Sequence, residues 1–333
     1  MTAAPLAPFP RGMRRLAWLV LAALALLPGA CFAAYPERPI SLVVAYPPGG
    51  GTDLVARAIA PFLEKYLGGG AKMVVVNRAG AGGEVGMAAL ANAAPDGYTI
   101  GFVNTPPLIT IPIERNAQFG GPQRFELLGN IIDDPCNFAV HADLPIRDLK
   151  ELAAYARANP GKVTVGTTGI GSDDHLVMLM FERAAGVKMT HIPYKGTAEV
   201  RAAIQSGQLT VAAMNVGEAL QGIRGGAPMR NIGQFAPSRS SLAPDLPTAR
   251  EQGFDIVLSS LRGMAAPKGL PADIRERLVK AVASAAADPE FQAQATKFFA
   301  PLRFLAPAQF EAENREADAV FRQLWKELPW AEK

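Results

Sequence analysis

Two glycine-rich stretches combine residue types that bind small anions. The first, PPGGGTD, runs from Pro47 to Asp53, and the second, TTGIGSDDH, runs from Thr167 to His175. Each follows an apolar, strand-like run and precedes a helix-like run. Helix N-termini carry free N–H groups and partial positive charge worth about 0.3–1 kcal/mol to an exposed anion, and glycine lets a ligand reach the backbone. The pair therefore predicts a site for an anion or a polar group. The expected helix caps are Thr52 or Asp53 in the first stretch and Ser172 or Asp173 in the second.

None of the glycine clusters has the spacing of a nucleotide-binding motif. A dinucleotide fingerprint needs G-x-G-x-x-G, and Leu54, Val85 and Asp174 stand where the third glycine should fall. The P-loop pattern and the nucleophile elbow G-x-S-x-G are absent. The three histidines lack the spacing of a zinc site, and no nucleophile, base and orienting residue can be assembled. We therefore expect no catalytic residue, no cofactor and no metal. For either glycine stretch alone, a tight turn without a ligand is the simpler interpretation.

The N-terminus has the pattern of a secretory signal peptide. Three arginines precede the apolar run 16–27, and PGACFAA follows it. The run has 12 residues, whereas a membrane span needs roughly 20. We predict that residues 1–33 are a signal peptide cleaved after Ala33 and that the protein is periplasmic. A lipoprotein anchored at Cys31 is the second choice, because Pro28 stands where leucine is expected.

Without residues 1–33 the chain has no net charge. The full sequence has 33 basic and 30 acidic residues, and the leader holds three of the arginines and no acid, which leaves 30 of each. This balance argues against a nucleic-acid partner. Cys136 is then the single cysteine, so no internal disulfide can form, and we expect its side chain to be a buried apolar group.

Alternating strands and helices must position the two glycine stretches. Helix-like runs end at glycines such as 68–70 and Gly207, and the part from Pro271 on is mostly helical. Such alternation predicts an α/β protein with largely parallel sheets, in which ligands bind at the carboxyl ends of strands. At 333 residues, two domains are expected. The strand-like runs are 40–46, 72–77, 99–104, 162–167 and 209–215.

Seven stretches in order along the chain resemble the Bug receptors, which are the periplasmic solute-binding proteins of tripartite tricarboxylate transporters. They cover nearly the whole exported chain. The stretches are RPISLVVAYPPGGGTDLVARAIA (38–60), VVVNRAGAGGEVGM (74–87), APDGYT (94–99), TGIGSDDHL (168–176), PYKGTAE (193–199), DLPTAREQGF (245–254) and GMAAPKGLP (263–271).

The resemblance implies a two-lobed periplasmic-binding-protein fold of the type II-like class. Each lobe would be a largely parallel sheet flanked by helices, and the lobes would close by hinge motion on a ligand in the cleft between them. Lobe one would comprise residues 35–138 and 256–333, and lobe two residues 139–255. The implied partners are a small carboxylate ligand and the membrane permease subunits of the transporter. We expect a monomer.

The resemblance also implies which residues hold the ligand. One carboxylate would be bound by backbone N–H groups, hydroxyls and bridging waters from the two glycine stretches. The residues carried over are Pro48, Gly49, Gly50, Thr52 and Asp53 from the first stretch and Thr168, Gly169, Gly171, Ser172 and His175 from the second. Further residues expected to line the cleft are Asn104, Thr105, Tyr194 and the segment from Asn215 to Glu218.

Asp173 and Asp174 depart from the family pattern, in which many relatives have small or neutral residues after the Gly-Ser. If either carboxylate faces the cleft, it repels an anion at about 4 Å by roughly 4 kcal/mol at an effective dielectric near 20, and Glu218 adds to this. The ligand would then be a zwitterion, an aromatic or amide-bearing monocarboxylate, or a polar neutral compound. In the alternative interpretation both aspartates cap the helix and face solvent. Asp133 and Asp134, which precede a proline, are expected in a solvated turn.

Two other functions fit the same pattern. A secreted α/β enzyme acting on a small organic acid would turn over its bound compound. A periplasmic ligand sensor would need a signalling partner instead of a permease. The cleft physics of a receptor and a sensor is identical, so the sequence does not separate them.

Overall fold

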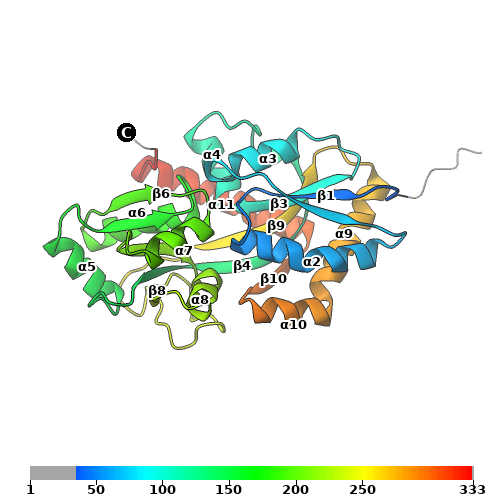
Figure 1. The fold of residues 1–333 in the computed structure, drawn as a ribbon. Helices are drawn as coiled ribbons and strands as arrows, with labels where there is room; N and C mark the ends of the chain where they lie inside the picture. Colours follow the sequence, from blue (N-terminus) through cyan, green and yellow to red (C-terminus); the bar gives the residue numbers. More distant parts are fainter. Residues whose placement is uncertain (1–34, 332–333) are drawn as a thin grey trace, which may run out of the picture.

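Two groups of parallel strands lie toward opposite ends of the molecule and are joined by two long strands (Figure 1). The computed structural model describes residues 35–331. The first strand group consists of β2 (Met73–Asn77), β1 (Ile40–Val44) and β3 (Thr99–Thr105). The second strand group consists of β7 (Val211–Asn215), β5 (Thr164–Thr167) and β6 (Thr190–Pro193). The strand order is β2-β1-β3-β9-β4-β7-β5-β6.

The joining strands make the centre of the sheet antiparallel. β9 (Ser259–Pro267) pairs with β3, and β4 (Phe125–His141) pairs with β9 and with β7, all antiparallel. β8 (Met229–Gln234) and β10 (Leu302–Leu305) also pair with β4 in antiparallel fashion. The α/β class is therefore confirmed, and parallel pairing holds within the two groups. The expectation of largely parallel sheets is wrong for the centre, because β9 brings the chain back from the second group and so runs opposite to β3.

Each strand of the two parallel groups is followed by a helix. In the first group the helices are α2 (Gly51–Leu67), α3 (Glu84–Ala91) and α4 (Pro107–Glu114), with a short turn η1 (Ala81–Gly83) before α3. In the second group they are α6 (Asp173–Ala185), α7 (Thr197–Gln205) and α8 (Val216–Arg224). This repeated order brings the helix N-termini to the carboxyl ends of the strands. The remaining helices are η2 (Pro122–Arg124), α5 (Leu149–Ala158), α9 (Ala272–Ala287), α10 (Pro289–Lys297) and α11 (Pro307–Glu327).

The buried apolar side chains form two large clusters that divide the chain in a characteristic way. One cluster draws on residues from Tyr35 to Ile132 and again from Met264 to Ala300. The other draws only on residues from Cys136 to Ile256. A smaller cluster of Ile109, Leu176, Phe321 and Trp330 connects α4, α6 and the C-terminal segment. Cys136 is fully buried and free, as predicted.

The two glycine stretches start their helices differently from each other. α2 begins at Gly51 with Gly50 as its N-cap, so the prediction that Thr52 or Asp53 caps it is wrong. The Asp53 carboxylate instead accepts from Gly49 N and pairs with Arg57. Ser172 caps α6, as predicted, by accepting from His175 N at 3.2 Å.

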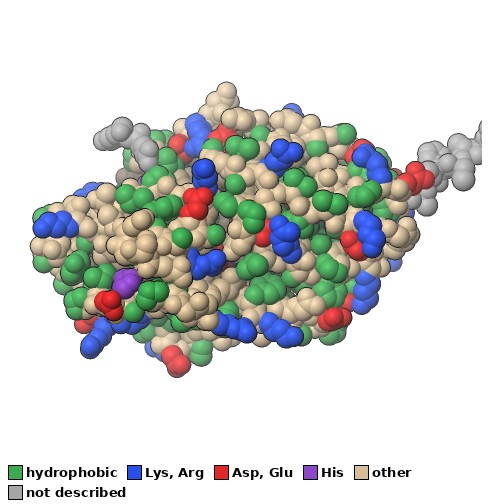
Figure 2. All heavy atoms as spheres, viewed as in Figure 1, with side chains coloured by type: hydrophobic (Ala, Val, Ile, Leu, Met, Phe, Trp, Pro, Cys, Tyr) green, Lys and Arg blue, Asp and Glu red, His purple; other side chains and the backbone are tan. Residues whose placement is uncertain are grey.

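Two expectations concern the surface and the membrane. On the face shown in Figure 2, basic and acidic side chains are interspersed without a broad basic area, which fits the balanced charge of residues 34–333. Across residues 35–331, no helix has the length and apolar character needed to cross a bilayer. The predicted signal peptide and the alternative anchor at Cys31 fall outside the described residues.

Candidate functional site

A small cavity lies where helix N-termini from both strand groups meet. Its volume is about 20 Å³, which is room for about one water molecule. The first glycine stretch and β3 contribute from one side, and the N-terminal ends of α6, α7 and α8 contribute from the other. The two sides are in contact beside the cavity, since Arg201 Nη2 of α7 donates to Gly49 O of the first glycine stretch at 3.2 Å. The cavity is lined by Tyr46, Pro47, Gly50, Gly51, Thr52, Asn104, Thr168, Asp173, Gly196, Thr197, Asn215, Glu218, Ser260 and Arg262.

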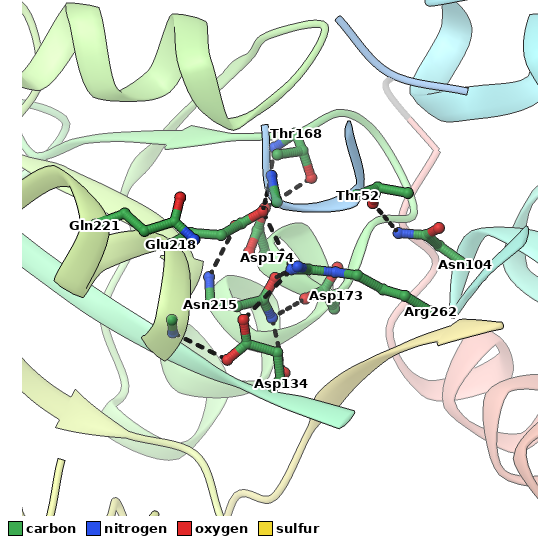
Figure 3. A network of polar contacts seen from close by, with 12 residues as sticks. Thr52, Asn104, Asp134, Thr168, Asp173, Asp174, Asn215, Glu218, Gln221 and Arg262 are labelled. Atoms are coloured by element: carbon green, nitrogen blue, oxygen red, sulfur yellow. Dashed lines mark hydrogen bonds and ion pairs between the residues drawn. The ribbon is translucent and has the colours of Figure 1, made fainter. Parts of the chain in front are cut away.

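A buried guanidinium group occupies the centre of this site (Figure 3). Arg262 lies on β9, directly opposite Asn104 of β3. Its Nη2 donates to Asn215 Oδ1 at 2.8 Å and lies 3.1 Å from Glu218 Oε1 and 3.5 Å from Asp134 Oδ2. A cation taken out of water is stable only when opposite charges and hydrogen bonds surround it. These contacts fix the Arg262 guanidinium at the cavity wall, where it can pair with a carboxylate.

Glu218 supplies that carboxylate from within the protein. Its Oε1 accepts from Gly51 N at 3.1 Å, at the N-terminus of α2, while also pairing with Arg262. Its Oε2 accepts from Asn215 N at 3.3 Å, which completes the capping box of α8. The Glu218 side chain, which comes from α8 beside the second strand group, therefore occupies the position at the N-terminus of α2 where a bound anion is predicted.

Asp173 and Asp174 are 5% and 1% exposed, so the interpretation that they face solvent is wrong. Asp173 lines the cavity, and its Oδ2 accepts from Asn215 Nδ2 at 2.7 Å and from Cys136 Sγ at 3.4 Å. Asp174 Oδ2 accepts from Thr168 N and Oγ1 at 3.2 and 2.7 Å, which fixes the second glycine stretch.

Asp134 is also buried, contrary to the expectation of a solvated turn. Asp133 and Asp134 both lie inside β4 rather than in a turn, and Asp134 Oδ1 accepts from Gly217 N at 3.0 Å. The proline that follows, Pro135, is accommodated within the long strand. The site therefore contains one more carboxyl group than the sequence indicates.

Burial changes the protonation of these carboxyl groups. Burial raises the pKa of Asp134 to about 8 and raises the pKa of Asp173. Burial and the neighbouring charge of Asp173 hold the pKa of Asp174 well above its usual range. At neutral pH part of this cluster is therefore protonated. In the described part of the chain, no three or more His, Cys, Asp or Glu side chains are grouped so as to hold a metal ion.

The N–H groups of the second glycine stretch are engaged by the protein itself. Gly169 N donates to Thr167 Oγ1 at 3.3 Å, and Gly171 N donates to His175 Nδ1 at 3.2 Å. The His175 ring stacks on His191 with centroids 4.0 Å apart. Burial lowers their pKa values to about 3 and 4, so both rings are neutral at physiological pH. His175 thus stabilises the turn of the second glycine stretch by accepting from Gly171 N.

Seven of the residues predicted from the sequence lie together on the cavity wall, and the other ten are not part of it. Thr105 donates to Asn314 of α11 at 2.5 Å, and Gly169 and Tyr194 line a neighbouring cavity beside Gly82. The residues on the wall are Gly50, Thr52, Asn104, Thr168, Asp173, Asn215 and Glu218. Those off the wall are Pro48, Gly49, Asp53, Thr105, Gly169, Gly171, Ser172, Asp174, His175 and Tyr194.

Arg262 is the central residue of the cavity that the sequence did not indicate, and Tyr46, Thr197 and Ser260 are further wall residues of this kind. A usable signal exists in the strand SSLRGMAAP, where an arginine interrupts an otherwise apolar and small-residue run. A charged residue inside a buried strand requires a partner or a ligand.

The two-part core, the joining strands and the cavity between the strand groups define a two-lobed solute-binding protein of the periplasmic-binding-protein class. The sequence model of one protein family, the tripartite tricarboxylate transporter family receptor, matches residues 55–306 of this chain. The chain belongs to this receptor family.

Relatives and solved structures agree with this assignment. A UPF0065 protein in the gbd 5'region of Cupriavidus necator is 33% identical over 87% of this chain and 88% of its own length. The structure of periplasmic binding protein BugD has a TM-score of 0.83, with 32% identity over 90% of this chain and 100% of that chain. The structure of MatC from Rhodopseudomonas palustris with bound malate has a TM-score of 0.80, with 27% identity over 87% of this chain and 99% of that chain.

Proposed function

We propose that this protein is a non-enzymatic periplasmic receptor that captures a small carboxylate-bearing metabolite and delivers it to the membrane subunits of a tripartite transporter. The observation that carries the proposal is the Glu218 carboxylate held by Gly51 N and Arg262. A helix N-terminus and a buried guanidinium that bind an internal carboxylate have the donors to bind that of a ligand. The malate bound to MatC supports the same ligand chemistry.

The proposed lobes are residues 35–138 with 256–333 and residues 139–255. Two separate apolar clusters, divided in the sequence near 132–136 and 256–264, support these boundaries. The two joining strands β4 and β9 would act as the hinge, because they are the strands that run between the clusters. Secretion with cleavage after Ala33 and a monomeric state complete the proposal.

Thermal melting against a ligand panel tests this function. The purified protein is unfolded, dialysed and refolded to remove any bound compound, and then melted with mono-, di- and tricarboxylates, amino acids and neutral amides. A ligand at a hundred times its dissociation constant adds about 2.7 kcal/mol, which raises Tm by a few degrees. A stabilising carboxylate that is recovered unchanged supports a receptor. Turnover of that compound would favour an enzyme, and no shift with any carboxylate would contradict the proposal.

Replacing Gly196 by alanine should disfavour closure and weaken ligand binding. Gly196 has an extended backbone (φ 174°), so alanine fits locally, but its Cβ would lie 2.8 Å from Pro47 Cδ across the cavity. Overpacking of this kind costs about 1–3 kcal/mol, and a closure penalty of this size lowers affinity roughly 5- to 150-fold. Titration calorimetry measures the affinity, and small-angle scattering measures the radius of gyration. The control is Gly225→Ala at the end of α8, off the cavity wall, whose Cβ meets nothing closer than Gln221 O at 3.3 Å. Equal affinities for the two variants would contradict a closing cleft.

A further inference from the structure

The cavity contains more acidic than basic side chains. Arg262 is the one cationic residue on its described wall, whereas Asp173 and Glu218 both line it. Asp134, which lies 3.5 Å from Arg262, and Asp174 are also buried. Burial raises the pKa values of Asp134, Asp173 and Asp174, so protons neutralise part of this negative charge in the ligand-free protein. A second ligand carboxylate would lie among these carboxyl groups with Arg262 already engaged, whereas an ammonium group would be stabilised as they ionise beside it. The acidic wall therefore favours a ligand that brings a positive charge along with a carboxylate.

An unpaired hydrogen-bond acceptor gives independent support. Asn104 lines the cavity and is 6% exposed, and its Nδ2 donates to Thr52 Oγ1 at 3.0 Å. Its Oδ1 is buried without a hydrogen-bond partner among the described residues. A buried acceptor of this kind requires a donor. An ammonium group is such a donor, whereas a carboxylate at neutral pH has no proton to donate.

The internal ion pair indicates how such a ligand would be arranged. Glu218 and Arg262 neutralise each other in the cavity at 3.1 Å, and the cavity leaves room for little more than one water. A ligand must therefore separate this pair as it enters. A ligand that carries both charges restores a partner to each residue, so neither buried charge is left alone.

We propose that the ligand is a zwitterion, with an amine and a carboxylate on one small molecule. Its carboxylate replaces that of Glu218 at Arg262 and Gly51 N, and its ammonium group is held by Asp173, the displaced Glu218 and Asn104 Oδ1. This inference rests on the proposed function and narrows it to one ligand class.

Two pairs of probes that differ by one ammonium group test the inference. They are succinate with L-aspartate, and propionate with L-alanine, each titrated at pH 7.5 into the refolded protein by calorimetry. We expect the amine-bearing member of at least one pair to bind at least tenfold more tightly than its partner. Equal binding within both pairs, or tighter binding of succinate or propionate, would overturn the zwitterion inference and leave the carboxylate receptor standing. No binding of any probe, together with no stabilisation by the wider panel, would overturn both proposals.

Two variants test whether Asp173 and Glu218 on the cavity wall cause the preference for amine-bearing ligands. Asp173→Asn should reduce the ratio of affinities within the preferred pair at least tenfold, because it removes a charge facing the ammonium group. Asp133→Asn is the matched control. It makes the same chemical change next to Asp134 on β4, but Asp133 pairs with Arg303 at the surface instead of lining the cavity. Asp173 also binds Asn215 and Cys136, so Glu218→Gln provides a second test that keeps those contacts. A ratio that stays unchanged in both folded variants would contradict the assignment.

Discussion

Arg262→Met is expected to destabilise the ligand-free protein by about 3–5 kcal/mol at pH 8. The substitution removes the cation that pairs with Glu218 and Asp134, and all three groups are buried. Desolvated carboxylates without a counter-charge are costly, whereas a methionine of similar length keeps most of the packing. Urea unfolding monitored by circular dichroism measures the difference in the free energy of unfolding.

The pH dependence of this loss separates charge from packing. Burial already raises the pKa of Asp134 to about 8, and without Arg262 it should rise further. Lowering the pH toward 5 protonates Asp134, so the deficit of the variant should shrink. Arg303→Met has the same change in net charge but breaks half-exposed pairs with Asp133 and Glu313, which are worth about 0–1 kcal/mol. A deficit that is equal for the two variants, or independent of pH, would show that the buried charge is not what Arg262 balances.

Asp174→Asn is expected to stabilise the ligand-free protein at pH 8. Burial and the charges of Asp173 and Glu218 raise the pKa of Asp174, so its protonated form is favoured when the chain is folded. Stability from such a group is fully present below the unfolded pKa near 4 and is lost as the pH rises through the folded pKa. Asparagine has no proton to lose, and its oxygen can still accept from Thr168 N and Oγ1. We therefore expect the free energy of unfolding of Asp174→Asn at pH 8 to exceed that of the parent protein.

The gain should fall as the pH is lowered from 8 to 5, and Tm measured across this range checks it. Carboxyl groups with lowered pKa, such as Glu251, whose pKa the Arg239 guanidinium lowers to about 2, act only below about pH 4.5 and are common to both proteins. Asp143→Asn removes an exposed carboxylate and should leave Tm unchanged at every pH. If Asp174→Asn lowers Tm at pH 8, then the carboxylate of Asp174 is needed for the turn and its burial is not a net cost.

The fold class was predictable because local patterns specify it. Strand-like runs followed by glycine-rich turns and then helices recur at β1, β2 and β5, and the chain forms these elements there. The directions of β4 and β9 were not predictable in this way. They depend on how the chain passes between the two strand groups, and that path leaves no periodic signal in the sequence.

The sequence by itself determined that two glycine stretches start helices at the ends of parallel strands, and that Asp173 and Asp174 are the unusual residues of the second stretch. Only the tertiary structure decided what those residues meet. Arg262 comes from a strand far along the chain, Glu218 reaches α2 from the other strand group, and Asp134 is buried within a strand. Backbone periodicity is local, whereas the electrostatic character of a cleft depends on side chains that only folding brings together.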